Sequence, residues 1–68
     1  MMYIFDNDLL SVYLKERKMS QAELATVTHI TESTICHYVK GDRTPSLNNF
    51  FKICAALDCN LSDLIVRL

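Results

Sequence analysis

The segment Ser20–Val39 constrains the fold most, because its pattern predicts two short helices joined by a tight turn. Ser20 is suited to the N-cap of the first helix, and Glu23, three residues later, completes a capping box. Thr31 provides the N-cap of the second helix. In that second helix the residues spaced to face inward are Ile35, Tyr38 and Val39. This helix pair is therefore the unit that the rest of the chain is expected to support.

Length and composition allow one small domain. The chain has 68 residues, of which 50% are hydrophobic, with one Gly and one Pro. Such a chain can bury only a small core, and its few turn-forming residues favour helices with short loops. The net charge is −1, so the chain as a whole has no excess of positive charge that would indicate a nucleic-acid partner. Any DNA binding has to come from the local placement of positive side chains.

Three further helices are predicted around the central pair. The first is capped by Asn7 or Asp8 and runs to Arg17–Lys18. After a loop in which Gly41 is suited to positive φ, a fourth helix begins from the cap Ser46. Asn60 caps a fifth, whose apolar residues are Leu61, Leu64, Ile65 and Leu68. The expected organisation is a single domain over 1–68, with an N-terminal arm at 1–7 and a helical bundle at 8–67.

Enzymatic, metal-binding and membrane functions find little support. An odd number of cysteines, three, argues against a disulfide framework and for a reducing cytoplasm. No Cys or His pair has zinc-ligand spacing. Cys36 and His37 are helical neighbours that point about 100° apart, so one cannot act as base for the other. Cys54 and Cys59 are expected in the core. We expect a soluble protein that is not an enzyme and has no cofactor or small-molecule ligand.

An ordered set of motifs resembles the XRE-type helix-turn-helix domains of phage lambda-type repressors and Cro proteins. The resemblance covers nearly the whole chain. It is carried by the segments Met19–Ala25, Ile30–Ile35, Gly41–Leu47 and Leu57–Ile65. It implies an all-α, five-helix lambda-repressor-like domain with the helix-turn-helix at its second and third helices. It also implies a cytoplasmic transcriptional regulator, of repressor type, that binds double-stranded operator DNA as a homodimer.

The resemblance assigns roles to individual residues. The helix from Thr31 to Val39 would lie in the major groove, and its base-reading positions correspond to Glu32, Ser33 and His37. Glu32 would accept from a cytosine amino group, and His37 would donate to a guanine. The positions expected at the DNA backbone are Ser20, Gln21, Thr31, Thr34, Lys40, Arg43 and Thr44.

Two positions depart from the family pattern. His29 stands where most members have Gly in the turn, at a position expected to have positive φ. Leu14 and Val39 stand where many members have an Arg and a Glu that pair inside the domain. Replacing both charges by apolar side chains is often neutral or stabilising, so we expect Leu14 and Val39 to touch.

Two surfaces leave alternatives open. The final helix, through Leu61, Leu64, Ile65 and Leu68, is the expected dimer surface, although these residues could instead close the monomer core. Met1–Phe5 could pack on its own domain as an extended arm or could contact a second subunit. A different class of function is a protein-interaction module, such as an antitoxin or anti-repressor, that uses the apolar segments Tyr3–Phe5 and Leu64–Leu68.

Overall fold

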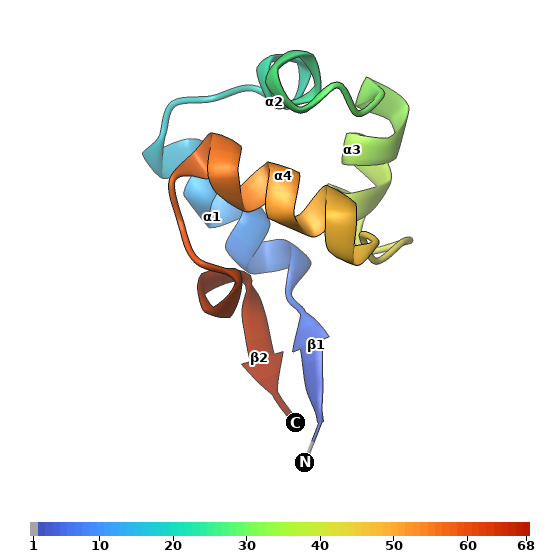
Figure 1. The fold of residues 1–68 in the computed structure, drawn as a ribbon, viewed down its shortest axis with the longest axis vertical. Helices are drawn as coiled ribbons and strands as arrows, with labels where there is room; N and C mark the ends of the chain where they lie inside the picture. The colour runs from blue at the N-terminus through green and yellow to red at the C-terminus, as the bar shows by residue number, and fades with distance from the viewer. Residues whose placement is uncertain (1) are drawn as a thin grey trace.

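Helical periodicity and capping residues determine most of the architecture. The protein is represented by a computed structural model that describes residues 2–68, and Met1 lies outside them. The helices are α1 (Asn7–Glu16), α2 (Gln21–Thr28), α3 (Glu32–Lys40) and α4 (Leu47–Leu57), followed by a 3₁₀ helix, η1 (Leu61–Leu64). Two strands, β1 (Tyr3–Phe5) and β2 (Ile65–Arg67), complete the fold (Figure 1). Within 2–68 no helix combines the length and apolar character needed to span a bilayer.

Every helical element contributes to one core. In Figure 1, α4 crosses in front of α1, with α2 at one end of the molecule and the two strands at the other. The largest side chains that are fully buried are Leu10, Leu24, Ile35, Ile53, Leu57 and Leu64. Burial of each such side chain is worth roughly 1.5–3 kcal/mol, so the helices hold one another in place mainly through this cluster.

The predicted caps at Ser20, Thr31 and Ser46 are all present. The Ser20 hydroxyl accepts from the Glu23 amide at 3.0 Å, and the Glu23 carboxylate accepts from the Ser20 amide at 3.0 Å. For α1 the predicted cap was wrong, because Asp6 accepts from the amides of Asp8 and Leu9 instead. Asn7 has another role, since its Nδ2 donates to the carbonyl of Val39 at 3.1 Å and ties the start of α1 to the end of α3.

Each α-helix is followed by a residue in the left-handed region. His29 (φ 59°) ends α2 and Gly41 (φ 88°) ends α3, which confirms both predictions of positive φ. Lys18 (φ 53°) and Asp58 (φ 53°) do the same after α1 and α4, where no sequence signal had been recognised. These residues reverse the chain direction in few residues and so keep the connections short.

The predicted fifth helix does not form beyond its first turn. Only Leu61–Leu64 is helical, as a 3₁₀ turn, and Ile65–Arg67 is a strand. Two β-branched residues, Ile65 and Val66, favour extended backbone. The fold is therefore mostly helical with a small sheet, and the five-helix, all-α prediction needs this correction.

The partner of β2 comes from the start of the chain. β1 and β2 are antiparallel, with Ile4 opposite Val66 and Phe5 opposite Ile65. The pairing continues beyond the strands, because the Asp6 amide donates to the Leu64 carbonyl and the Leu68 amide to the Met2 carbonyl, both at 2.8 Å. Such pairing between distant segments is invisible to local periodicity.

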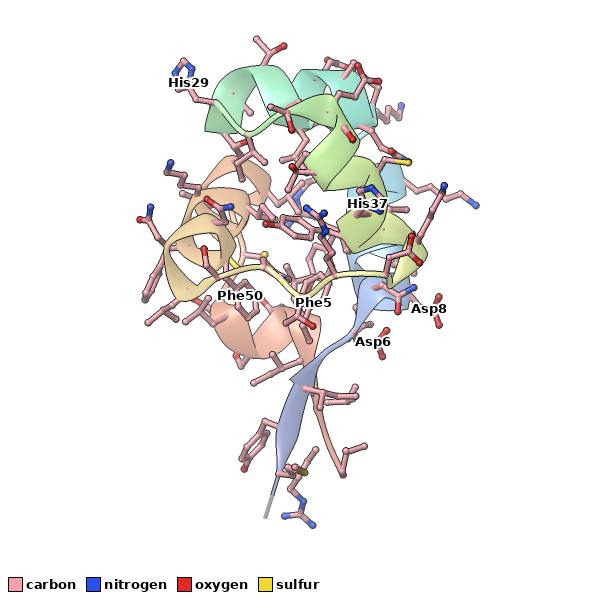
Figure 2. All side chains as sticks on the ribbon, turned by 90° about the vertical axis from the view of Figure 1, so that its right-hand side faces the viewer. Phe5, Asp6, Asp8, His29, His37 and Phe50 are labelled. Carbon is pink, nitrogen blue, oxygen red and sulfur yellow. The ribbon has the colours of Figure 1, made fainter. Side chains whose placement is uncertain are left out.

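Some residues of the N-terminal arm and of the expected dimer surface are buried in the core, and others are exposed. The Phe5 ring meets the Phe50 ring edge to face, with centroids 5.5 Å apart, which joins β1 to α4 (Figure 2). Leu64 is fully buried within its own chain, so it closes the core, which was the alternative given for it. Leu61 and Ile65 are partly buried, and Leu68 is 68% exposed.

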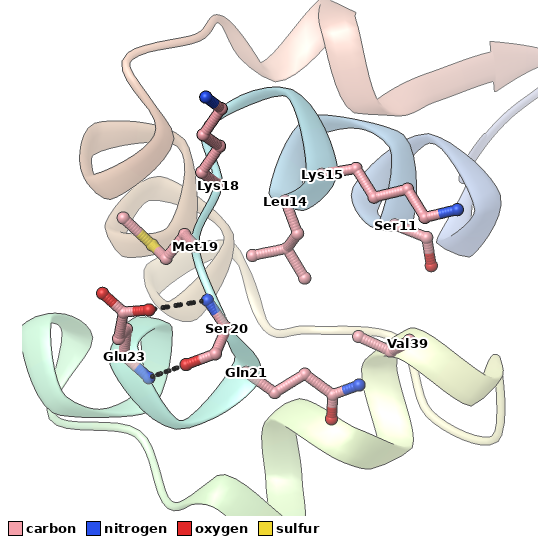
Figure 3. Close-up of a pocket in the computed structure, with 9 residues that line it drawn as sticks. All are labelled: Ser11, Leu14, Lys15, Lys18, Met19, Ser20, Gln21, Glu23 and Val39. Carbon is pink, nitrogen blue, oxygen red and sulfur yellow. Dashed lines mark hydrogen bonds between the residues drawn. The ribbon is translucent and has the colours of Figure 1, made fainter.

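Leu14 and Val39 line one pocket between α1 and α3 (Figure 3). Leu14 belongs to the buried cluster, and Val39 packs against that cluster from its partly exposed edge. Their direct contact stays a prediction, but both side chains border the same space.

Gly41→Ala is expected to lower the free energy of unfolding by roughly 1–3 kcal/mol, as measured by urea denaturation. A Cβ at this position would have an unfavourable φ and would lie 3.1 Å from side-chain atoms of Asn7. A double-mutant cycle with Asn7→Ala separates the two causes, because only the steric part disappears in the double variant. Unchanged stability of Gly41→Ala would contradict the backbone geometry.

Leu14→Arg alone is expected to destabilise the domain by about 3 kcal/mol, because it places an unpaired charge at a buried position. Adding Val39→Glu should recover roughly 1 kcal/mol or more, since the new charges can pair across the pocket. Thermal and urea denaturation of both single variants and the double variant measure the coupling. A coupling energy of zero would show that the two positions are too far apart to interact.

Candidate nucleic-acid interface

The inner face of α3 fixes the orientation of its outer face. Ile35 and Tyr38 are buried in the core, and the Tyr38 hydroxyl accepts from Asn49 Nδ2 at 3.0 Å. The helix cannot rotate without exposing these groups. Glu32 and Ser33 are consequently exposed, and His37 is partly exposed (Figure 2). The three residues predicted to reach base edges therefore belong to the part of α3 that is open to solvent.

Threonine hydroxyls order the start of α3. The Thr31 hydroxyl accepts from the Thr34 amide at 3.2 Å and donates to the Thr34 hydroxyl at 2.8 Å. Thr31 is exposed and Thr34 partly exposed. Both predicted backbone-contact residues thus lie at the N-terminus of α3, where free amides and the helix dipole favour an anion.

His37 has an acidic partner that sequence reasoning missed. Its Nδ1 lies 3.1 Å from Asp42 Oδ2. The left-handed Gly41 turns the chain back, and the Asp42 amide donates to the His37 carbonyl at 3.0 Å. This reversal brings Asp42 beside the imidazole. The contact uses Nδ1 and leaves the other ring nitrogen, Nε2, available for a further hydrogen bond.

The last residue of α3 and the loop after it carry the other predicted cations. Lys40, Arg43 and Thr44 are all exposed, whereas Pro45 is buried. The buried proline holds the loop against the domain, so the cations lie on an anchored segment at the C-terminal end of α3. Asp42 lies between Lys40 and Arg43 in the chain and offsets part of their charge.

A second group of cations, from the end of α1 and the turn after it, lies beside the start of α2. A pocket of about 520 Å³ is bordered by Gln21 and by Lys15 and Lys18 (Figure 3). Sequence reasoning named Gln21 and Ser20 but not the two lysines, since cations near the end of α1 also suit its helix dipole. The spacing of the lysines, three apart on a helical pattern, was the available signal.

Arg17, between these lysines, has a structural role instead. Its Nε donates to the Leu57 carbonyl at 2.9 Å, and its guanidinium lies 5.1 Å from the centre of the Tyr13 ring. These contacts direct it toward the end of α4. Lys15 and Lys18 therefore border the pocket beside Gln21, whereas Arg17 does not.

Cys54 and Cys59 lack the features of reactive thiols. Cys54 is buried, and burial together with neighbouring Cys59 raises its pKa to about 12. Burial also raises the pKa of Cys59. A thiol with a raised pKa holds little thiolate at neutral pH and is a poor nucleophile. Among residues 2–68, no group of three or more His, Cys, Asp or Glu side chains is arranged to hold a metal ion.

Comparison with solved structures gives the fold a context. The restriction-modification controller protein C.AhdI from Aeromonas hydrophila is 26% identical, with a TM-score of 0.80 over 84% of this chain and 86% of that one. The transcriptional regulator VanUg is 25% identical, with a TM-score of 0.77 over 100% of this chain and 89% of that one. An HTH_3 family transcriptional regulator from Vibrio cholerae, at 21% identity and TM-score 0.77, shares the fold over 32% of its own length.

A search of curated protein sequences gave no match. A family model for the Cro/C1-type HTH DNA-binding domain, however, matches residues 9–67. This range runs from α1 to the end of β2 and includes the whole helix-turn-helix unit with the candidate interface. The chain belongs to the Cro/C1-type helix-turn-helix DNA-binding family.

Proposed function

We propose that this protein is a transcriptional repressor that binds operator DNA as a homodimer, with α3 in the major groove. The observation that carries the proposal is the fixed outer face of α3, where Glu32, Ser33 and His37 are accessible while Ile35 and Tyr38 are buried. A helix held in this way can present a constant set of donors and acceptors to base edges.

Base recognition on this proposal rests on few side chains. Glu32 accepts a hydrogen bond from a cytosine amino group, and His37 donates from Nε2 to a guanine. Ser33 can donate or accept, so it is permissive. A carboxylate is unfavourable among phosphates unless it finds its donor, so Glu32 discriminates strongly against a base pair that offers none.

Phosphate contacts come from both ends of the helix-turn-helix unit. Gln21 and the start of α2 bind one phosphate, with Lys15 and Lys18 beside them. Lys40, Arg43 and Thr44 bind phosphates near the end of α3, and Ser20, Thr31 and Thr34 supply hydroxyls and capped amides. Because the net charge is −1, these local cations supply most of the electrostatic attraction.

The regulatory role is supported by the solved relatives. One is named a controller protein and another a transcriptional regulator. Dimerisation would place two α3 helices about 34 Å apart, one DNA turn, on a palindromic site. Repression then follows if the bound dimer occupies a promoter.

A protein-interaction module is the second candidate function. It is favoured by one observation, the exposed apolar side chains Leu47 and Phe51, which are 66% and 53% accessible and lie one turn apart on α4. Such residues can bind another protein. Selection from random DNA duplexes separates the two functions, because an operator-binding protein enriches a palindromic sequence and an interaction module enriches none.

Gln21→Ala and Arg43→Ala are each expected to weaken operator binding about tenfold. Only Arg43→Ala is also expected to lower the salt slope of log Kd, by about 1, because the glutamine side chain carries no charge. The reason is the loss of one phosphate contact in each variant. Fluorescence anisotropy at several salt concentrations measures both quantities. Lys52→Ala, an exposed cation on α4, serves as the control, and equal losses in all three variants would contradict the assigned interface.

Glu32→Gln is expected to relax or change the preference at one base pair of each half-site. A glutamine amide pairs best with adenine, whereas a carboxylate is best matched by the cytosine amino group. The expected discrimination is roughly 1–3 kcal/mol at that position, measured by competition among single-base operator variants. If every position responds equally to the substitution, Glu32 does not read a base.

A further inference from the structure

The imidazole of His37 and the carboxylate of Asp42 form a pair at the C-terminal end of α3. Nδ1 of His37 lies 3.1 Å from Oδ2 of Asp42, and the two side chains are 38% and 55% exposed. The Asp42 amide also donates to the His37 carbonyl at 3.0 Å, so the backbone holds the two residues together. The ring therefore keeps one nitrogen, Nδ1, toward the carboxylate and the other, Nε2, away from it.

The carboxylate decides which ring nitrogen carries the hydrogen. An ionised carboxylate has no hydrogen to donate, so Nδ1 of His37 is the donor in the contact with Asp42. A neutral imidazole has one N–H group, and with that hydrogen on Nδ1 the other nitrogen, Nε2, can only accept. Nε2 becomes a donor only when the ring takes up a second proton and is positively charged.

Guanine presents only acceptors, N7 and O6, in the major groove. The guanine contact proposed for His37 consequently requires the imidazolium form. We propose that Asp42 is a positioning residue that restricts His37 to reading guanine in its protonated form, so that operator binding takes up a proton. This inference rests on the proposed function, because His37 belongs to the face of α3 that is proposed to meet DNA.

The immediate surroundings of His37 favour the protonated ring. Asp42 is in direct contact, and His37 belongs to the last turn of α3, where the negative end of the helix dipole stabilises a cation. The phosphates of a bound duplex add to this attraction.

Other charged groups act on the imidazole without touching it. Lys40 and Arg43 oppose protonation, but both are exposed, so solvent and salt screen their effect. The elements packed against α3, α3 itself and the loop after it carry charged groups that form no ion pair with His37 among residues 2–68: Asp8, Lys15 and Glu16 on α1, Glu23 on α2, Glu32 and Lys40 on α3, and Arg43 in the loop.

The pH dependence of operator affinity tests the proposal. Histidine side chains change charge between about pH 5 and 8. Above the pH at which the free ring loses its proton, binding has to return that proton, so the operator Kd rises by up to about tenfold per pH unit. Fluorescence anisotropy with the selected operator measures this slope for the wild type. A Kd that does not change with pH, or that falls as the pH rises, would overturn the proposal.

Asp42→Asn separates positioning from charge. An asparagine amide can donate to Nδ1 as well as accept from it, so neutral His37 can carry its hydrogen on Nε2 and donate to guanine. The variant is expected to keep the preference for guanine among single-base operator variants and to lose most of the pH slope. A full pH slope in folded Asp42→Asn would contradict the positioning role.

Two matched variants serve as controls. Asp58→Asn makes the same change at an exposed residue after α4, and His29→Asn removes the other histidine at a left-handed position that asparagine tolerates. Both are expected to keep the pH slope of the wild type. Loss of the slope in His29→Asn would assign the proton to the wrong histidine. Circular dichroism checks that each variant is folded.

Nitrogen NMR of the free protein measures the tautomer of His37 without DNA. At alkaline pH the neutral ring is expected to carry its hydrogen on Nδ1 in the wild type and to lose this preference in Asp42→Asn. A hydrogen on Nε2 in the wild type would overturn the inference and leave the operator function intact. Failure of random duplexes to yield an enriched sequence would instead refute the operator function, and the reading of guanine with it, whichever tautomer is found.

Discussion

Burial of the inner face of α3 is the interaction on which the rest of the structure depends. Ile35 is fully buried and Tyr38 nearly so, and Tyr38 is also held by Asn49 of α4. These contacts fix the rotation of α3 about its own axis. Since a helix exposes one face when it buries the opposite one, the position of every candidate base-reading side chain follows from this packing.

The ends of α3 are fixed as firmly as its middle. Thr31 caps the first turn, and at the other end Asn7 bonds the Val39 carbonyl while Gly41 adopts positive φ. The same Gly41 turn brings Asp42 to His37. The left-handed conformation of Gly41 thus ends α3 and begins the loop that carries Arg43. It also places Asp42 against Nδ1 of His37, which leaves Nε2 of the imidazole available.

Local signals in the sequence predicted most of the helical scaffold. The caps Ser20, Thr31 and Ser46 and the left-handed Gly41 could be recognised because each acts within a few residues of itself. The positive φ of His29 was expected from the family resemblance, since most members have Gly at that position. The β1–β2 ribbon was missed because β2 depends on a partner strand whose paired residues lie 60 to 64 positions away in the chain, and an apolar periodic pattern alone favoured a helix there.

The candidate site shows the same division between local and long-range information. Glu32, Ser33 and His37 could be named because the resemblance to the helix-turn-helix family assigns these positions of one helix to base reading. Lys15 and Lys18 could not, because only the packing of α1 against the start of α2 brings them beside Gln21. Asp42 was missed for a related reason, since the turn at Gly41 rather than the sequence spacing places it next to His37.

The central claim is that the outer face of α3 is the surface that meets DNA. Amide chemical-shift mapping by NMR, during titration with a selected operator duplex, tests it most directly. The largest shifts are expected on residues 31–37, at the start of α2 and in the loop after α3. Shifts concentrated on α4 around Leu47 and Phe51, with α3 unperturbed, would contradict it.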